Sequence, residues 1–86
     1  MSLSIQDFKK KLDEEHAFPE VYMFKFIVPS SAEQEVLDIL PEGKTTSRAS
    51  KQGTYISVTA ELMMGTSDDV IAIYQKAHKI EGLIAL

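Results

Sequence analysis

The stretch from Ser47 to Thr59 reads SRASKQGTYISVT, and it decides the fold of this chain. From Thr54 to Met64, residues of one parity are apolar and those of the other are mostly polar, the pattern of a strand with one buried face. A Lys-Gln-Gly turn precedes this strand, and Gly53 can supply the positive φ that a tight hairpin needs. The stretch therefore predicts an antiparallel hairpin whose first strand, residues 44–50, is short, polar and suited to a sheet edge.

The rest of the chain predicts a strand and helix on either side of this hairpin. Apolar residues at helical spacing and capping signals predict three helices, and two further apolar runs predict strands. With short connections and right-handed crossovers, this order gives an α+β fold: a ferredoxin-like βαββαβ domain, with a four-stranded antiparallel sheet and two helices on one face. The predicted parts are an N-terminal amphipathic helix or arm in residues 1–17, with its helix at 5–15, and a domain in residues 18–86, with strands at 20–28 and 83–86.

The length of the hairpin loop decides which way Arg48 points. A three-residue loop would place Arg48 on the helix-covered face beside Ile56, and turn statistics favour it. A two- or four-residue loop would place Ala49 there instead and turn Arg48 to the face of Tyr55. An unpaired charge in a core costs several kcal/mol, more than a turn preference, so we predict the even loop and a buried Ala49.

With that loop, the sheet face away from the helices becomes the candidate functional surface. Its mixture of cations and hydroxyls suits a carboxylate-bearing ligand or a partner protein. The candidate binding residues are Lys25, Arg48, Ser50, Tyr55 and Ser57.

A purely structural interpretation of this face is also open. The N-terminal helix, through Ile5, Phe8 and Leu12, or a second copy of the chain could cover it, with Lys25 paired to Glu61. Because two cations on the face disfavour a dry interface, we expect the helix to cover part of the sheet. Any homodimer should then be weak and concentration-dependent.

Composition excludes several classes of function. The 86 residues include no cysteine, which rules out disulfides and thiolate chemistry, and His16 and His78 lack the spacing of a metal site. The net charge of −4 disfavours nucleic acid as a partner. No catalytic constellation is present, so we expect no enzyme activity and no cofactor or metal. The charged N-terminus and the lack of a long apolar run predict a cytoplasmic protein without membrane association.

Two other functions share this strand order. An RNA-recognition surface needs aromatic residues on the first and third strands of the open face, where only Tyr55 is available. An acylphosphatase-like site needs an arginine in the loop after the first strand, and residues 29–32 contain neither arginine nor glycine.

Three parts of the sequence carry a family resemblance. They are the Ser-x-x-Gly-x-Tyr-x-Ser-Val-Thr pattern of residues 50–59, Phe18-Pro19 before the first strand, and the Tyr74 to Ile80 spacing before the last. This set resembles the YbeD-like family of small bacterial proteins. The resemblance implies an ACT-like ferredoxin fold and a regulatory role linked to lipoate. ACT domains hold an effector beside a glycine-containing turn, whereas the turn here, Pro29-Ser30-Ser31, has no glycine.

Together these observations predict a non-catalytic regulatory or ligand-sensing domain that binds a small acidic ligand or an unidentified protein partner. The alternative is a protein–protein interaction module that acts through the open sheet face or the edge strand and takes no small-molecule ligand.

Overall fold

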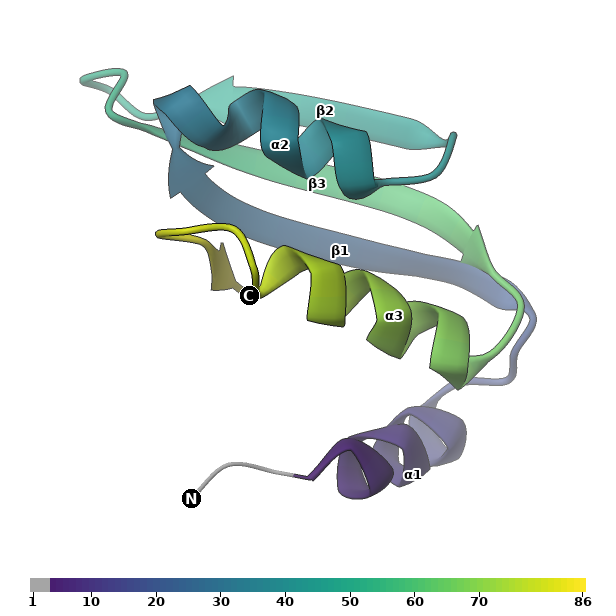
Figure 1. Ribbon diagram of the computed structural model, residues 1–86. Helices are drawn as coiled ribbons and strands as arrows, with labels where there is room; N and C mark the ends of the chain where they lie inside the picture. Colours follow the sequence, from purple (N-terminus) through teal and green to yellow (C-terminus); the bar gives the residue numbers. More distant parts are fainter. Residues whose placement is uncertain (1–3) are drawn as a thin grey trace.

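A computed structural model describes residues 4–86 and places two of its helices on one face of a four-stranded sheet (Figure 1). The strands are antiparallel in the order β2-β3-β1-β4, which confirms the predicted ferredoxin-like fold with an N-terminal helix. The elements are α1 (Ile5–Glu15), β1 (Glu20–Pro29), the 3-10 turn η1 (Ser30–Ala32), α2 (Glu33–Ile39), β2 (Lys44–Ala49), β3 (Tyr55–Met64), α3 (Ser67–Ala77) and β4 (Ile84–Ala85).

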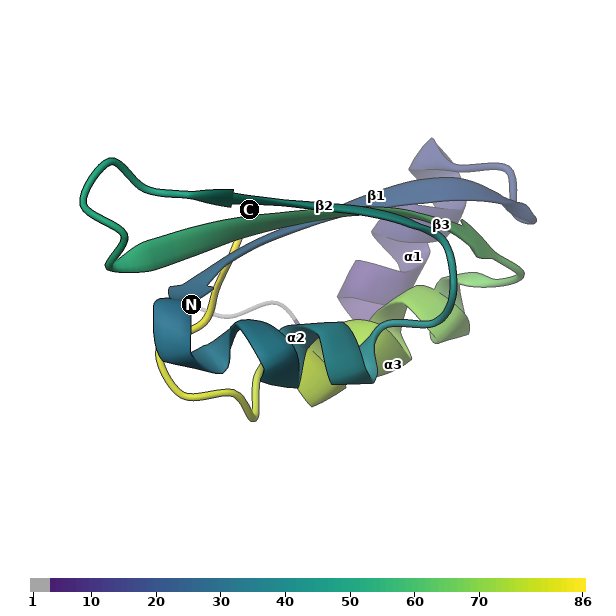
Figure 2. The same cartoon turned by 90° about the horizontal axis from the view of Figure 1, so that it is seen from above.

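The core lies between the sheet and helices α2 and α3, and alternate residues of β1 and β3 build it (Figure 2). Phe24 and Phe26 of β1 are fully buried and stack with ring centroids 6.0 Å apart. The buried residues form one contiguous cluster, with Leu40, Ile56 and Tyr74 partly buried at its margin. Burial of these side chains is the main favourable term in the stability of so small a domain.

The hairpin between β2 and β3 has the even loop that burial favoured. Arg48 pairs with Ser57 and Ala49 with Ile56, and the backbone N–H of Ser50 donates to the carbonyl of Tyr55 at 2.8 Å. Residues 51–54 form the loop, and Gly53 has a φ of 73°. Arg48 therefore lies on the face of Tyr55, as predicted. The prediction that Ala49 is buried was wrong, because the hairpin extends past the end of the helix layer and leaves Ala49 exposed (Figure 2).

Helix α1 packs beside α3 and leaves the outer face of the sheet uncovered (Figure 1). Its Phe8 ring meets the Tyr74 ring edge-on, with centroids 5.5 Å apart, and Leu12 is buried in the core cluster. The expectation that this helix covers part of the sheet was therefore wrong. The apolar stripe of α1 packs instead against a group of aromatic side chains at the margin of the helix layer. In this group the rings of Tyr22 and Tyr74 lie edge to face.

The last strand is shorter than predicted. Only Ile84 and Ala85 form β4, paired with Ile27 and Phe26, and the backbone N–H of Leu86 donates to the carbonyl of Lys25 at 2.9 Å. No helix within residues 4–86 is long and apolar enough to cross a lipid bilayer.

Candidate functional site on the open sheet face

The surface opposite α2 and α3, which we call the open face, carries every second residue of each strand. The pairing register places residues of matching parity in rows across the sheet, because directly opposed residues point to the same side. The members of the open face are Val21, Met23, Lys25 and Ile27 of β1, Lys44, Thr46 and Arg48 of β2, Tyr55, Ser57, Thr59, Glu61 and Met63 of β3, and Ile84 of β4.

A shallow depression in the open face, which we call the basic hollow, brings the two predicted cations to one place. Arg48 stands opposite Ser57, while Thr59 stands between Thr46 and Lys25. With strands about 4.8 Å apart, the Lys25 and Arg48 side chains rise from backbones roughly 10 Å apart across the sheet and flank the hydroxyls between them. The hollow has a volume of about 320 Å³ and is lined by Lys25, Thr46, Ser47, Arg48, Ser57 and Thr59.

The cations of the basic hollow carry no acid partner. Among the residues that the structure describes, no carboxylate forms an ion pair with Lys25 or Arg48. The expected partner, Glu61, instead lies 3.6 Å from the amine of Lys44 at the end of β2. The pairing of Lys25 with Glu61 was therefore wrong, and the hollow presents two positive charges beside hydroxyls that can donate to an anion.

Ser50 and Tyr55 lie apart from the basic hollow, at the hairpin end of the sheet. The Ser50 hydroxyl accepts from the backbone N–H of Tyr55 at 3.2 Å, so it helps to close the hairpin. Tyr55 is exposed and lines a separate depression over the hairpin loop with Lys51, Gln52 and Thr54. Of the five predicted residues, the structure thus gathers Lys25, Arg48 and Ser57 and assigns a structural contact to Ser50.

Thr46 and Thr59 complete the basic hollow, although neither was among the predicted binding residues. The signal was present in the sequence. With the even loop, Thr46 must share a face with Arg48, two residues away, and Thr59 must share a face with Ser57.

The opposite end of the open face is apolar. Val21, Met23 and Met63 are 56%, 57% and 65% exposed, although they lie on two adjacent central strands. Large apolar side chains that are neighbours and this exposed often mark an interaction surface.

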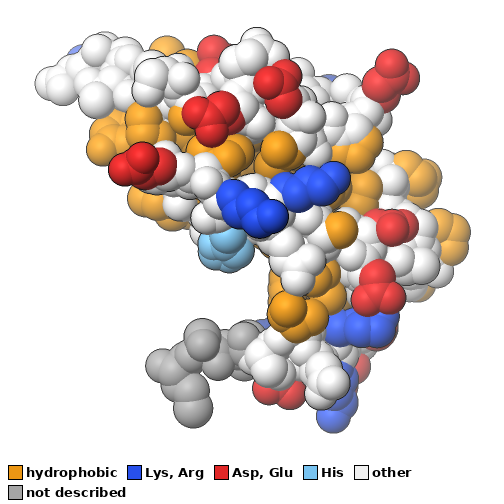
Figure 3. All heavy atoms as spheres, viewed as in Figure 1, with side chains coloured by type: hydrophobic (Ala, Val, Ile, Leu, Met, Phe, Trp, Pro, Cys, Tyr) orange, Lys and Arg blue, Asp and Glu red, His pale blue; other side chains and the backbone are white. Residues whose placement is uncertain are grey.

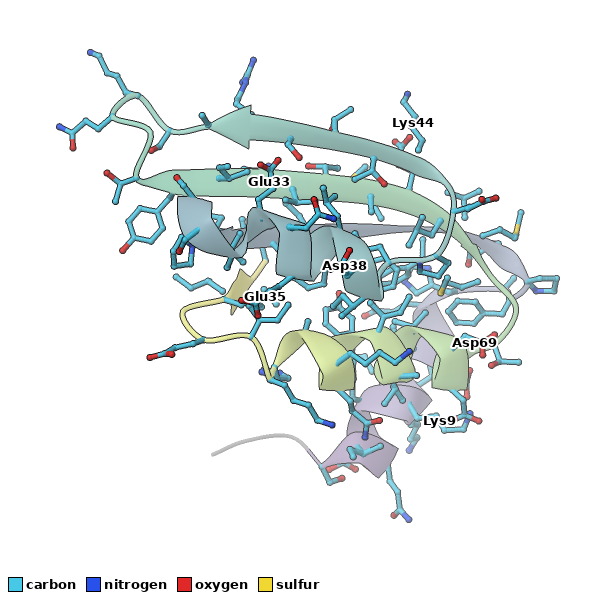
Figure 4. The ribbon with its side chains drawn as sticks, turned by 45° about the horizontal axis from the view of Figure 1, so that its top comes forward. Lys9, Glu33, Glu35, Asp38, Lys44 and Asp69 are labelled. Atoms are coloured by element: carbon cyan, nitrogen blue, oxygen red, sulfur yellow. The ribbon has the colours of Figure 1, made fainter. Side chains whose placement is uncertain are left out.

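Charge is divided between the two faces of the molecule. The open face holds the cations Lys25, Lys44 and Arg48 and the carboxylate of Glu61. The helix side is acidic, and Figure 3 shows carboxylates gathered over α2. In Figure 4, Glu33, Glu35 and Asp38 project from α2, while Lys44 points outward from β2 and away from them. The open face is therefore net positive on a protein of net charge −4.

Within residues 4–86, a strongly shifted pKa is found for Tyr74, which lies on the helix side, remote from the open face. Burial, aided by the 3.1 Å hydrogen bond between the Tyr22 and Tyr74 hydroxyls, raises the pKa of Tyr74 well above the usual tyrosine value. The tyrosine pair packs against Phe8 and Phe24, in the aromatic group that anchors α1. Within residues 4–86, no three His, Asp or Glu side chains are arranged to hold a metal ion.

One comparison with known proteins identifies a family. The family model described as "Protein of unknown function (DUF493)" matches residues 13–86, which is most of the chain and includes all four strands. Searches of curated proteins and of solved structures found no match.

Proposed function

The chain belongs to the DUF493 family, the YbeD family of small uncharacterised proteins that its sequence resembles, and we propose that it is a non-catalytic regulatory domain that senses a small acidic ligand. The ligand's anionic group would bind in the basic hollow, between Lys25 and Arg48. One observation carries the proposal: two cations flank the Ser57 and Thr59 hydroxyls without an acid partner among residues 4–86.

The chemistry of the hollow favours a carboxylate with an extended body. Arg48 can form two parallel hydrogen bonds to a carboxylate, and the Lys25 amine can supply a third. Beyond Lys25, the apolar side chains of Ile27 and Ile84 lie on the same face and would contact a short hydrocarbon chain. The family resemblance makes lipoate, a carboxylate on a short apolar chain, the first ligand to test.

A binding role fits this geometry better than catalysis. Both cations stand on an open surface, where water would screen a charge that develops in a transition state. We accordingly propose that the protein has no enzyme activity, and we keep the expectation that it works in the cytoplasm.

Amide NMR titration with three probes tests this proposal. Lipoate and octanoate should shift the amides of Lys25, Ser57 and Thr59, whereas lipoamide, which lacks the carboxylate, should not. Arg48→Gln should weaken lipoate binding by about tenfold, the value of a lost charged hydrogen bond. Lys51→Gln removes a cation from the hairpin loop outside the hollow and serves as the matched control. Equal binding of lipoamide, or an equal loss in the control, would contradict the proposal.

The exposed apolar end of the open face supports a second candidate, a protein–protein interaction module. Because α1 does not cover Val21, Met23 and Met63, a partner protein or a weak homodimer would bury them. Recovery of one stoichiometric partner in a pull-down, together with no thermal shift from the acidic probes, would favour this candidate. Met63→Lys should then abolish recovery of the partner and leave the melting temperature unchanged.

A further inference from the structure

Strand β2 forms the outer border of the sheet. It is the terminal strand in the order β2-β3-β1-β4, so one side of Lys44–Ala49 pairs with β3 and the other meets no strand within residues 4–86. In Figure 4 no helix lies beyond β2 on that outer side. Such an edge presents unpaired backbone groups that another extended chain can meet.

The hydrogen-bond pattern shows which residues present these groups. Because Ser50 donates to the carbonyl of Tyr55, and the pairing continues without a bulge, Thr46 and Arg48 also exchange bonds with β3. The intervening residues must point their N–H and C=O groups outward, and these are Thr45, Ser47 and Ala49. Two other backbone bonds fit the same rule, that alternate residues of a strand bond to opposite sides. They run from the N–H of Ser30 to the carbonyl of Thr54 and from the N–H of Leu86 to the carbonyl of Lys25.

The side chains beside this edge indicate the charge of its partner. Lys44 and Arg48 lie four residues apart on the open face of β2, roughly 13 Å along the strand. An added strand would place every second side chain beside them. Acidic residues there would pair with Arg48, which has no acid partner among residues 4–86, and with Lys44, whose amine also lies 3.6 Å from Glu61. On the other side of the sheet, the carboxylates of α2 disfavour acidic residues at the intervening positions (Figure 4).

A second copy of β2 does not fit this edge. Antiparallel pairing of two copies through their outward-pointing residues would bring Lys44 of one copy opposite Arg48 of the other, or close to it, and like charges directly opposed are destabilising. Basic side chains on an edge strand are a common protection against such self-pairing. The outer edge of β2 therefore disfavours pairing with a second copy and favours pairing with an acidic chain.

We propose that the outer edge of β2 binds an extended acidic segment of a partner protein by strand addition. The segment donates to and accepts from the backbones of Thr45, Ser47 and Ala49, and its alternate acidic side chains face Lys44 and Arg48. Main-chain hydrogen bonds supply affinity and the alternating charges supply specificity. The edge shares Arg48 with the basic hollow, but its outward backbone groups belong to β2 alone, so the inference does not depend on a small acidic ligand.

The probe for this proposal is the acetylated and amidated peptide Glu-Val-Glu-Val-Glu. On binding, the amides of Thr45, Ser47 and Ala49 should shift and gain protection from hydrogen exchange, while those of Thr46 and Arg48 are already protected in the free protein. Methylation of the two valine nitrogens, which would face β2, should weaken binding by at least about tenfold. The peptide Lys-Val-Lys-Val-Lys should not bind.

Variants of Ser47 and Lys25 distinguish strand addition at this edge from binding in the basic hollow, which Ser47 and Arg48 also line. Ser47→Pro removes an outward N–H without removing a bond to β3 and should abolish peptide binding, whereas Ser47→Ala should bind as the parent does. Lys25→Gln should not alter binding. If the amides of β2 do not shift, or if the methylated peptide binds equally well, the proposal is wrong. Shifts confined to Lys25 and Thr59, lost in Lys25→Gln, would also overturn it and would assign the peptide to the basic hollow.

Discussion

The amine of Lys9 donates a hydrogen bond to the Ser67 hydroxyl across 2.8 Å, and so joins α1 to the first residue of α3. Ser67 is 2% exposed, and the carboxylate of Asp68 lies 3.2 Å from the same amine. Figure 4 shows Lys9 reaching from α1 toward the start of α3. This contact, together with the packing of Phe8 on Tyr74, holds α1 on the helix side of the molecule.

Loss of the Lys9 amine should therefore destabilise the protein. Lys9→Met should lower the free energy of unfolding by about 1–2 kcal/mol, because it leaves the buried Ser67 hydroxyl without its donor. Lys10→Met, on the exposed side of the same helix, should change it by less than about 0.5 kcal/mol. Urea denaturation of both variants checks the prediction, and equal values for the two would contradict it.

The packing of α1 can be tested with two apolar residues of the same helix. Leu12→Ala should cost about 2–3 kcal/mol, because Leu12 is 3% exposed and belongs to the core cluster. Ile5→Ala is the control, since Ile5 is 56% exposed and its truncation should cost less than about 1 kcal/mol. A loosely attached arm would give a small change in both thermal melts.

Stability at high pH should depend on Tyr74. Since burial raises its pKa in the folded state, the unfolded chain loses this proton first as the pH rises above the ordinary tyrosine value of 10.0. The stabilisation that the neutral hydroxyl contributes is complete below pH 10 and is lost as the pH rises toward the folded pKa. Tyr74→Phe should cost about 1 kcal/mol at pH 7 through the lost bond to Tyr22, and its deficit relative to the parent should shrink above pH 10. A deficit that stays constant across this range in chemical denaturation would refute the assignment.

A charge should destabilise the protein strongly at one alanine on the helix side of the hairpin strands and hardly at all at another. Ala60→Asp should cost about 3 kcal/mol or more, because Ala60 is fully buried opposite Phe24. Ala49→Asp should change stability by less than about 0.5 kcal/mol, since Ala49 is exposed. Melting temperatures of the two variants give the comparison. A large loss in Ala49→Asp would mean that the helix layer extends over the hairpin.

These contrasts show what the sequence can predict. The side to which Arg48 points follows from alternation and from the cost of a buried charge, both of which are local. The exposure of Ala49 depends instead on how far the helices reach. The seven residues of α2 span about 10 Å at 1.5 Å per residue, whereas the ten residues of β3 span about 33 Å. Comparing these lengths would have predicted that the hairpin extends past α2.

The position of α1 could not be derived in the same way. Its stripe of Ile5, Phe8 and Leu12 suits any apolar surface, and the open face and the margin of α3 both offer one. The deciding partners, Tyr22 and Tyr74, lie 52 residues apart in sequence, and only the folded sheet brings them together. The basic hollow was predictable in part, because the even hairpin loop turns Arg48 to the face that carries Ser57 and Lys25, but its lack of a carboxylate depends on Glu61 turning to Lys44.

The division of charge between the faces determines how this protein meets other molecules. The open face carries three cations and one carboxylate, a net +2, so a total of −4 leaves −6 on the rest of the molecule. The protein is thus a molecular dipole, and an approaching anion is turned toward the open face before contact and repelled from the helix side. Association with acidic molecules should be fast in dilute buffer. Its rate should fall as the ionic strength rises above about 0.1 M, where the screening length is about 10 Å. The folded chain thus orients an approaching anion toward the open face during diffusion, before any bond forms.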